Sequence, residues 1–410
     1  MRETLIEQGT VIDSAGAKHY CGRAMFCFGF ALSIYVCVCV YFVLRTFRRA
    51  ALYNNWKVLT PAEQEQWLPY RRNDAGRLDI FPIILGGVLL VPWRVPLALF
   101  IVFSNGVWAG VLGCGGLGTT ALLSLLCRWI LCVSVRLHSR ILLYVFGIWR
   151  IDEHFPRNGK EEGNHLKTNA RVIVSNHVSC LDIPYFIYAS CAAFVSKSVL
   201  QKVPFIGDAA ESLNCIFIDR ESEADRNIGL QKIKGRCELL RREPDANPLV
   251  IFPEGTTTNG RCLLRFRRGA FCGFHPVQPV VLIYRCSHVD VAYELLPSLD
   301  WTLLTLSSTG LVKLEAYWLP PVDPPPAYAF NSDDERASAF ASMVREAMWA
   351  ELCARRCSSA GASARKCPDW TGSGKLRMQL EQILVQRQQR DVPIAPYISE
   401  EQGDTREKAL

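Results

Sequence analysis

Residues 171–182, which read RVIVSNHVSCLD, decide the fold of this chain. The run 171–175 is rich in β-branched residues and predicts a short buried strand. The strand leads directly into Asn176 and His177, and Asp182 follows five residues after the histidine. A carboxylate at that spacing can hold the imidazole across a turn and fix its tautomer, so that the other ring nitrogen can take a proton from a hydroxyl. Alone, such a pair is more often an ordinary surface or capping pair.

Similar β-branched runs recur along the chain and are separated by helical patterns. The apolar positions within Glu223–Arg242 have the spacing of an amphipathic helix, and Ser338–Arg355 predicts a last helix. Alternating strands and helices indicate an α/β fold, a sheet with parallel pairs flanked by helices. The predicted strands are 171–175, 193–196, 215–218, 249–252, 279–283 and 312–316.

Three further blocks follow predicted strands. In the first, Phe217 is followed by Asp219 and Arg220, and an arginine at a strand end is a fixed cation suited to phosphate, or else half of a surface ion pair. The second reads FPEGTTTNG over residues 252–260. Its amides and hydroxyls could hold a phosphate or a diol, and Glu254 could contact a hydroxyl or a cation; an ordinary Gly/Thr turn is the alternative.

The last block contains RFRRGAF at 265–271 and PVQPV at 276–280. Three arginines in this block could meet anionic headgroups or CoA phosphates, or form a solvated face. Four strand-end blocks in this order are far more specific than any one of them. Together they resemble the motifs of the glycerolipid acyltransferase family over about residues 130–320. The forms at 252–260 and 269–280 look most like the lysophosphatidylcholine/lysophosphatidylethanolamine acyltransferase branch, although Asn214 stands where that family commonly has glycine.

The resemblance implies an acyl-CoA-dependent lysophospholipid acyltransferase. His177 would be the general base on the acceptor hydroxyl and Asp182 would hold its ring, with direct transfer from acyl-CoA and no covalent acyl-enzyme. No metal and no cofactor are expected beyond acyl-CoA as co-substrate, and no EF-hand run of the kind carried by some relatives is found. The implied substrate-binding residues are Asn176, Phe217, Arg220, Phe252, Pro253, Glu254, Gly255, Thr256 and Pro279.

Other functions stay open from the sequence. The acceptor could instead be 1-acylglycerol-3-phosphate or glycerol-3-phosphate, and a catalytically silent membrane scaffold could keep the same fold. The joint presence of His177, Asp182, Arg220 and Glu254 argues against the scaffold. A serine hydrolase is disfavoured because the chain has no Gly-x-Ser-x-Gly elbow.

Composition narrows the class of protein. The 410 residues carry a net charge of +7 and are 50% hydrophobic, which argues against disorder and gives no sign of nucleic-acid binding. The 17 cysteines lie scattered among apolar runs, unlike the framework of a small secreted domain. We therefore interpret them as reduced and mostly buried.

The long apolar runs of the sequence lie in the first third of the chain. Residues 24–44 carry no charge and can cross a hydrocarbon core of about 30 Å. Residues 81–127 carry one charge, Arg94, and predict either two spans or a re-entrant hairpin. Residues 129–135 and 141–151 alternate apolar and basic residues, as in an interfacial segment or an ordinary surface helix.

The distribution of basic residues predicts orientation. The loop 45–79 holds more Lys and Arg than residues 1–23, which places it in the cytosol by the positive-inside rule, and a hairpin would keep the rest of the chain there. An odd number of crossings would reverse this. We expect an integral protein of the endoplasmic reticulum whose partners are the bilayer, acyl-CoA and a lysophospholipid. The expected organisation is a tail (1–23), a transmembrane helix (24–44), a basic cytosolic loop (45–80), a membrane hairpin with interfacial helices (81–150), the catalytic domain (151–356) and a polar tail (357–410).

Overall fold

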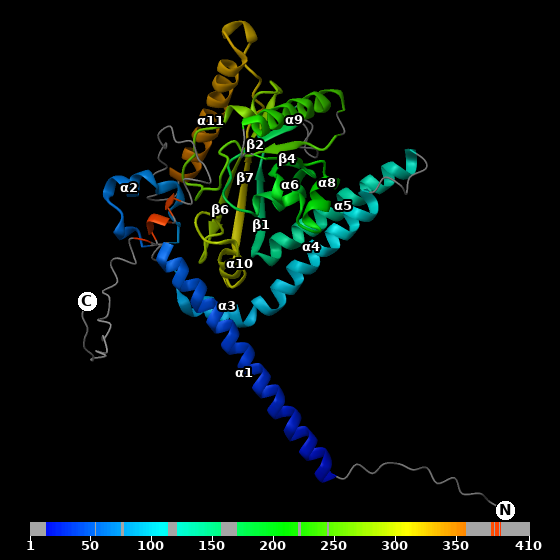
Figure 1. The fold of residues 1–410 in the computed structure, drawn as a ribbon, viewed down its shortest axis with the longest axis vertical. Helices are drawn as coiled ribbons and strands as arrows, with labels where there is room; N and C mark the ends of the chain where they lie inside the picture. Colours follow the sequence, from blue (N-terminus) through cyan, green and yellow to red (C-terminus); the bar gives the residue numbers. More distant parts are fainter. Residues whose placement is uncertain are drawn as a thin grey trace, which may run out of the picture.

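A seven-stranded sheet forms the centre of the protein (Figure 1). The structure is a computed structural model that describes residues 14–53, 55–74, 78–113, 121–156, 170–219, 223–243, 246–357, 379–380, 382–384 and 386. The strand order is β1-β7-β6-β2-β5-β3-β4. All neighbouring pairs are parallel except β6 and β7. The strands are β1 (Ile148–His154), β2 (Val172–Ser175), β3 (Ala193–Lys197), β4 (Ile216–Ile218), β5 (Leu249–Ile251), β6 (Val277–Cys286) and β7 (Val312–Trp318).

All six predicted strands are present, and the predicted α/β sheet with helices on its faces is confirmed. The prediction for residues 148–151 was wrong, because they begin β1 rather than continue an amphipathic segment. Helix α5 (Ala121–Val145) ends just before Gly147, whose positive φ of 87° turns the chain. The carbonyl of Gly147 then accepts the amide of Val312 at 2.9 Å, and β1 pairs with β7.

Helices cover both faces of the sheet, because side chains of neighbouring strand residues point to opposite sides. Ile173 packs into one apolar cluster with residues of α5, α6 (Asp182–Ser190) and α10 (Ser298–Leu306). Val172 and Val174 pack into a second cluster with α9 (Glu223–Arg242) and α11 (Asp333–Cys357). The bounds of α9 agree with the predicted helix. Two short helices, α7 (Ser198–Gln201) and α8 (Ile206–Ser212), lie between β3 and β4.

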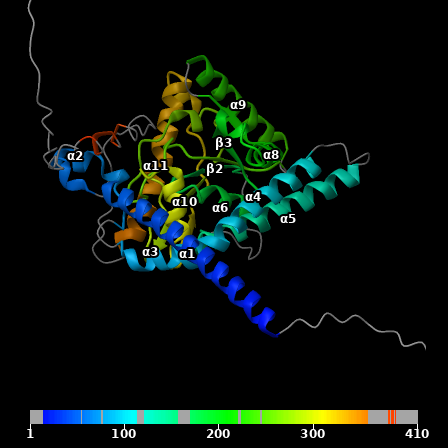
Figure 2. The same ribbon diagram turned by 60° about the horizontal axis from the view of Figure 1, so that its bottom comes forward.

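The N-terminal third is helical. Helix α1 (Ser14–Tyr53) includes the expected span and continues into the expected loop, which also contains η1 (Trp56–Val58), α2 (Pro61–Gln66) and η2 (Leu68–Tyr70). The side chains of α1 are described from residue 33. The far end of α1 extends away from the sheet (Figure 2). Its near end is fixed to α10, where Arg49 pairs with the buried Asp300 at 2.7 Å.

Helices α3 (Ile80–Leu89), α4 (Val91–Gly113) and α5 follow, with α4 and α5 side by side in both views (Figures 1 and 2). In the part of the chain that the structure describes, one helix, at Val91–Gly110, is long and apolar enough to cross a membrane. Near the carboxyl end, Leu380 and Leu384 are fully buried in the apolar cluster of α5 and α6, although the sequence predicted a polar tail there. The tail therefore contributes apolar side chains to the core.

Candidate active site

Two of the sequence blocks meet where parallel strands end. Strands β2 and β5 are neighbours, with Val174 paired to Ile251, so the residues that follow them emerge at the same edge of the sheet. His177 follows β2, and Phe252 and Glu254 follow β5. The sheet therefore brings together two blocks that are about 75 residues apart in sequence.

His177 and Asp182 form a directed pair. The imidazole Nδ1 lies 2.8 Å from Oδ2 of Asp182, which is fully buried, and the carboxylate fixes Nδ1 as the protonated nitrogen because it can only accept. The same oxygen also accepts the backbone amides of Val178 and Ser179, at 2.7 and 3.0 Å. Asp182 is itself the first residue of α6, where the helix dipole favours a negative charge. The carboxylate is thus held in place by donors of the turn that precedes its helix.

The second oxygen of Asp182 is bound from a distant strand. Tyr284, on β6, donates its hydroxyl to Oδ1 at 2.6 Å. Burial and the adjacent Asp182 raise the pKa of Tyr284 well above its ordinary value, so that this hydroxyl remains a donor. No sequence pattern predicted this partner, because it lies 102 residues beyond Asp182 and its position depends on strand pairing.

The ring of His177 is held from one face. The ring of Phe252 stacks on it with centroids 4.0 Å apart and an interplanar angle of 12°. The His177 side chain is 19% exposed, and no described residue forms a hydrogen bond with its Nε2. A histidine with Nδ1 bound to a carboxylate and Nε2 open can accept a proton from a substrate hydroxyl.

Glu254 binds the backbone on both sides of the site. It is fully buried, and its two oxygens accept the amides of His177 and Leu264, each at 3.0 Å. Burial raises the pKa of Glu254 to about 8, and the two amides oppose that rise. Both oxygens of Glu254 are occupied by these amides, and the charge of nearby Arg345 also lowers its pKa. The expected contact of this carboxylate with a substrate hydroxyl stays a prediction.

Three other predicted substrate-binding residues lie within the sheet or are bonded to its backbone. Asn176 is fully buried and uses its amide group to pair with the backbone of Leu282 on β6, at 2.8 and 3.0 Å. Pro279 is buried within β6, in register with Val174. Phe217 lies on the edge strand β4, two strands beyond β5, and lines a shallow groove against α9.

The remaining predicted residues belong to the turn after β5. Pro253 is buried, and Gly255 and Thr256 are half-buried. Gly255 has a positive φ of 73°, and a Cβ there would lie 2.5 Å from Nε of Arg267, so the turn requires glycine. Arg220 lies outside the described residues, and its predicted role stays a prediction. No described group of three or more His, Cys, Asp or Glu side chains could hold a metal ion.

Part of the chain is similar to known acyltransferases. Residues 152–283 match the family model named Acyltransferase. Lysophospholipid acyltransferase LPEAT1 of Arabidopsis thaliana is 32% identical over 242 residues, covering 55% of this chain and 59% of the relative. Lysophosphatidylcholine acyltransferase 1 of Homo sapiens is 30% identical over 194 residues, covering 45% of this chain and 33% of the relative. The solved structure of the 1-acyl-sn-glycerophosphate (LPA) acyltransferase PlsC from Thermotoga maritima is 20% identical, with a TM-score of 0.42 over 63% of this chain and 95% of its own.

Residues 152–283 are therefore an acyltransferase domain. The chain is similar over this region to relatives named lysophospholipid acyltransferase and lysophosphatidylcholine acyltransferase. The chain spans 59% and 33% of the length of the two curated relatives described above.

Proposed function

We propose that this protein is an acyl-CoA-dependent lysophospholipid acyltransferase that re-acylates lysophosphatidylcholine or lysophosphatidylethanolamine. The single observation that carries the proposal is the His177–Asp182 pair, which leaves Nε2 open at the carboxyl edge of the sheet. The relatives, a lysophospholipid acyltransferase and a lysophosphatidylcholine acyltransferase, suggest the substrate class.

The geometry supports a direct transfer. Nε2 of His177 takes the proton of the acceptor hydroxyl as its oxygen attacks the thioester carbonyl of acyl-CoA. The new ester C–O bond forms, the C–S bond breaks, and the proton passes from the imidazolium to the departing CoA thiolate. Asp182 stabilises the imidazolium between the two proton transfers, since its charge lies 2.8 Å from Nδ1. Phe252 and Glu254 fix the ring and the backbone of the base.

We further propose that α4 lies along the membrane surface and does not cross the bilayer. Near its start, Arg94 donates to the carbonyls of Leu306 and Ser308 at the end of α10, each at 2.9 Å. In the middle of α4, Phe103 packs edge-on against Phe205 at 4.8 Å, beside α8. The same domain thus contacts α4 near its start and in its middle. In a crossing helix, α8 with its exposed Asp208 would lie deep in hydrocarbon, at a high energetic cost.

The opposite side of these helices is suited to lipid. Large apolar side chains on α3, α4 and α5 are strongly exposed, among them Phe81 (71%), Phe100 (64%) and Trp129 (64%). Arg45 and Arg49 flank the expected span and contact Asp300 of α10, so the basic flank and the catalytic domain lie on one side. By the positive-inside rule that side is the cytosol, and we propose the endoplasmic reticulum as the membrane.

One assay panel tests the proposed function. Full-length purified protein in lipid vesicles is given radiolabelled acyl-CoA with lysophosphatidylcholine, lysophosphatidylethanolamine, lysophosphatidate or glycerol-3-phosphate. We expect labelled phospholipid from one of the first two acceptors. Preference for lysophosphatidate or glycerol-3-phosphate would replace the proposed acceptor, and no transfer to any acceptor would contradict the enzyme. A His288→Ala variant, which changes an exposed histidine after β6, is the matched control for His177→Ala.

A further inference from the structure

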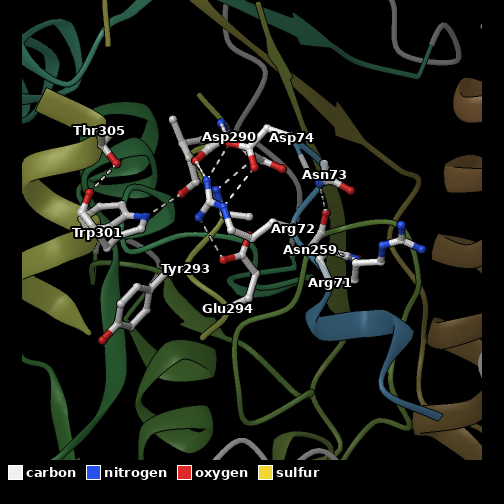
Figure 3. A network of polar contacts seen from close by, with 12 residues as sticks. Arg71, Arg72, Asn73, Asp74, Asn259, Asp290, Tyr293, Glu294, Trp301 and Thr305 are labelled. Carbon is white, nitrogen blue, oxygen red and sulfur yellow. Dashed lines mark hydrogen bonds and ion pairs between the residues drawn. The ribbon is translucent and has the colours of Figure 1, made fainter. Parts of the chain in front are cut away.

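A short segment from the N-terminal third reaches the two loops that flank His177. The segment Leu68–Asp74 follows α2 and lies against residues 290–294 and against Asn259 (Figure 3). Neither the proposed chemistry nor the sequence blocks use this segment. It nevertheless contains one of the most completely buried ion clusters among the described residues, with 1% of the Arg72 side chain exposed.

Arg72 makes the first connection. Its guanidinium donates to both oxygens of Asp74, at 2.9 and 2.7 Å, to Oε2 of Glu294 at 3.3 Å and to the carbonyl of Asp290 at 3.2 Å. Asp74 in turn accepts the amide of Asp290 at 2.8 Å. The side chains of Asp74 and Glu294 are 4% and 0% exposed, so this forked contact is shielded from water. Arg72 thereby fixes the loop 290–294.

That loop is bonded to the turn that carries the base. The amide of Tyr293 donates to the carbonyl of Val178 at 2.9 Å. Ser179 donates its hydroxyl to the carbonyl of Val291 at 2.7 Å, and the indole of Trp301 donates to the same carbonyl at 3.1 Å. A displacement of the loop would therefore move the residues immediately after His177.

Asn259 makes the second connection. Its side-chain amide donates to the carbonyls of Leu68 and Arg71, each at 2.8 Å, and its backbone amide donates to the carbonyl of Pro69 at 2.8 Å. Asn73 donates back to the carbonyl of Asn259 at 2.9 Å. The preceding residue, Thr258, donates its amide to the carbonyl of His177 at 2.9 Å. By this route, Asn259 is bonded to the segment and its neighbour Thr258 is bonded to the backbone of His177.

We propose that Leu68–Asp74 is a positioning clamp for the catalytic base, in which Arg72 and Asn259 act through the backbone of His177 and Val178 to set the direction of the imidazole. Two independent routes end on the carbonyls of adjacent residues, so the clamp limits both translation and rotation of the turn. The proposal rests on the proposed acyl transfer, because that reaction gives the direction of Nε2 its importance. The clamp also joins the membrane-proximal third of the chain to the active site.

The test compares Arg72→Lys and Asn259→Ala with two surface controls. Arg72→Lys keeps the charge and loses the fork, and Asn259→Ala removes both side-chain bonds to the segment. Arg150→Lys changes an exposed arginine paired with Asp152 at 2.7 Å, and Asn331→Ala changes an exposed asparagine. For the clamp variants, we expect kcat for acyl transfer to fall about 10- to 100-fold with KM for both substrates within about twofold of wild type. The controls should stay within about twofold in both constants.

Amide hydrogen exchange of the full chain gives a readout that needs no activity. We expect the exchange rate of residues 176–182 to rise about tenfold in the clamp variants and to stay unchanged in the controls. If Arg72→Lys does not fold, kcat and hydrogen exchange of the Asn259→Ala variant test the clamp on their own. Unchanged exchange of residues 176–182, or kcat within about threefold of wild type in every folded clamp variant, would overturn the clamp. Absence of acyl transfer in the wild-type protein would instead contradict the proposed function. In that case the hydrogen-exchange rates of residues 176–182 would still test whether the clamp holds the turn.

Discussion

Replacement of Asp182 by asparagine separates the charge of this residue from its shape. Oδ2 accepts three N–H donors, from His177, Val178 and Ser179, whereas Oδ1 faces only the hydroxyl of Tyr284. An asparagine can place its oxygen at the first position and its amino group at the second, where the hydroxyl oxygen of Tyr284 can accept. Asp182→Asn should therefore keep every hydrogen bond and the tautomer of His177.

The charge that stabilises the imidazolium is lost. At about 4 Å between charge centres and an effective dielectric constant of about 20, the attraction is about 4 kcal/mol. The amides of Val178 and Ser179 already neutralise part of the carboxylate charge, so we expect a loss of about 2–4 kcal/mol. This corresponds to a fall in kcat of about 30- to 1,000-fold. Stability should fall by only about 1 kcal/mol, because the bonds become neutral but remain made.

The assay is kcat for acyl transfer to lysophospholipid, with thermal unfolding measured on the same preparation. Asp152→Asn, at an exposed ion pair with Arg150, is the matched control and should leave kcat unchanged. Asp182→Ala leaves four donors without this acceptor, three at Oδ2 and the hydroxyl of Tyr284 at Oδ1, and should lose more than about 3 kcal/mol of stability. Folded Asp182→Asn protein with kcat within about threefold of wild type would refute the role of the charge. Unfolding comparable to that of Asp182→Ala would refute the argument about its hydrogen bonds.

Three further outcomes follow from the same site. Phe252→Leu removes the ring stacked on His177. We expect kcat to fall about 10-fold in steady-state kinetics and the free energy of unfolding in urea to fall by about 1–2 kcal/mol. An unchanged kcat would contradict the stacking argument. Glu254→Gln turns an amino group toward the amide of either His177 or Leu264, so thermal unfolding should show a loss of about 1–3 kcal/mol, in contrast to Asp182→Asn. Burial raises the pKa of Glu254 and Glu294 to about 8, above the ordinary 4.5, so the folded protein retains protons that the unfolded chain releases. The free energy of unfolding should therefore fall as pH rises from about 5 through about 8, and Glu294→Gln should flatten this slope; a slope of opposite sign in urea titrations would contradict it.

The sequence predicted the parts of the fold that depend on local pattern. Helix α9 and the strands β2 to β7 were recognised from hydrophobic spacing, and strand-end placement brought Phe252 and Glu254 to His177. Strand β1 was missed because its residues, IWRIDEH, alternate apolar and charged side chains at the end of a long helical pattern. Its pairing with β7, more than 150 residues later, is a tertiary contact that periodicity does not report.

The chemistry of individual side chains was less predictable than their position. Glu254 and Asn176 stand in the expected blocks, but each is saturated by backbone groups, a fact that depends on which amides the fold presents to them. Tyr284 was missed for the same reason, and so was the contact of Arg72 with Glu294, because Asp182 and Glu294 come from other parts of the chain. A motif thus identified the turn from His177 to Asp182, whereas the groups that hold it required the three-dimensional structure.

The central claim is that His177 is the base that activates the acceptor hydroxyl. Its most direct test is kcat for acyl transfer from acyl-CoA to lysophospholipid by purified, folded His177→Ala protein, with His288→Ala as control. We predict a fall of at least about 1,000-fold for His177→Ala with the control unchanged. Transfer by His177→Ala at a rate within about tenfold of wild type would contradict the account.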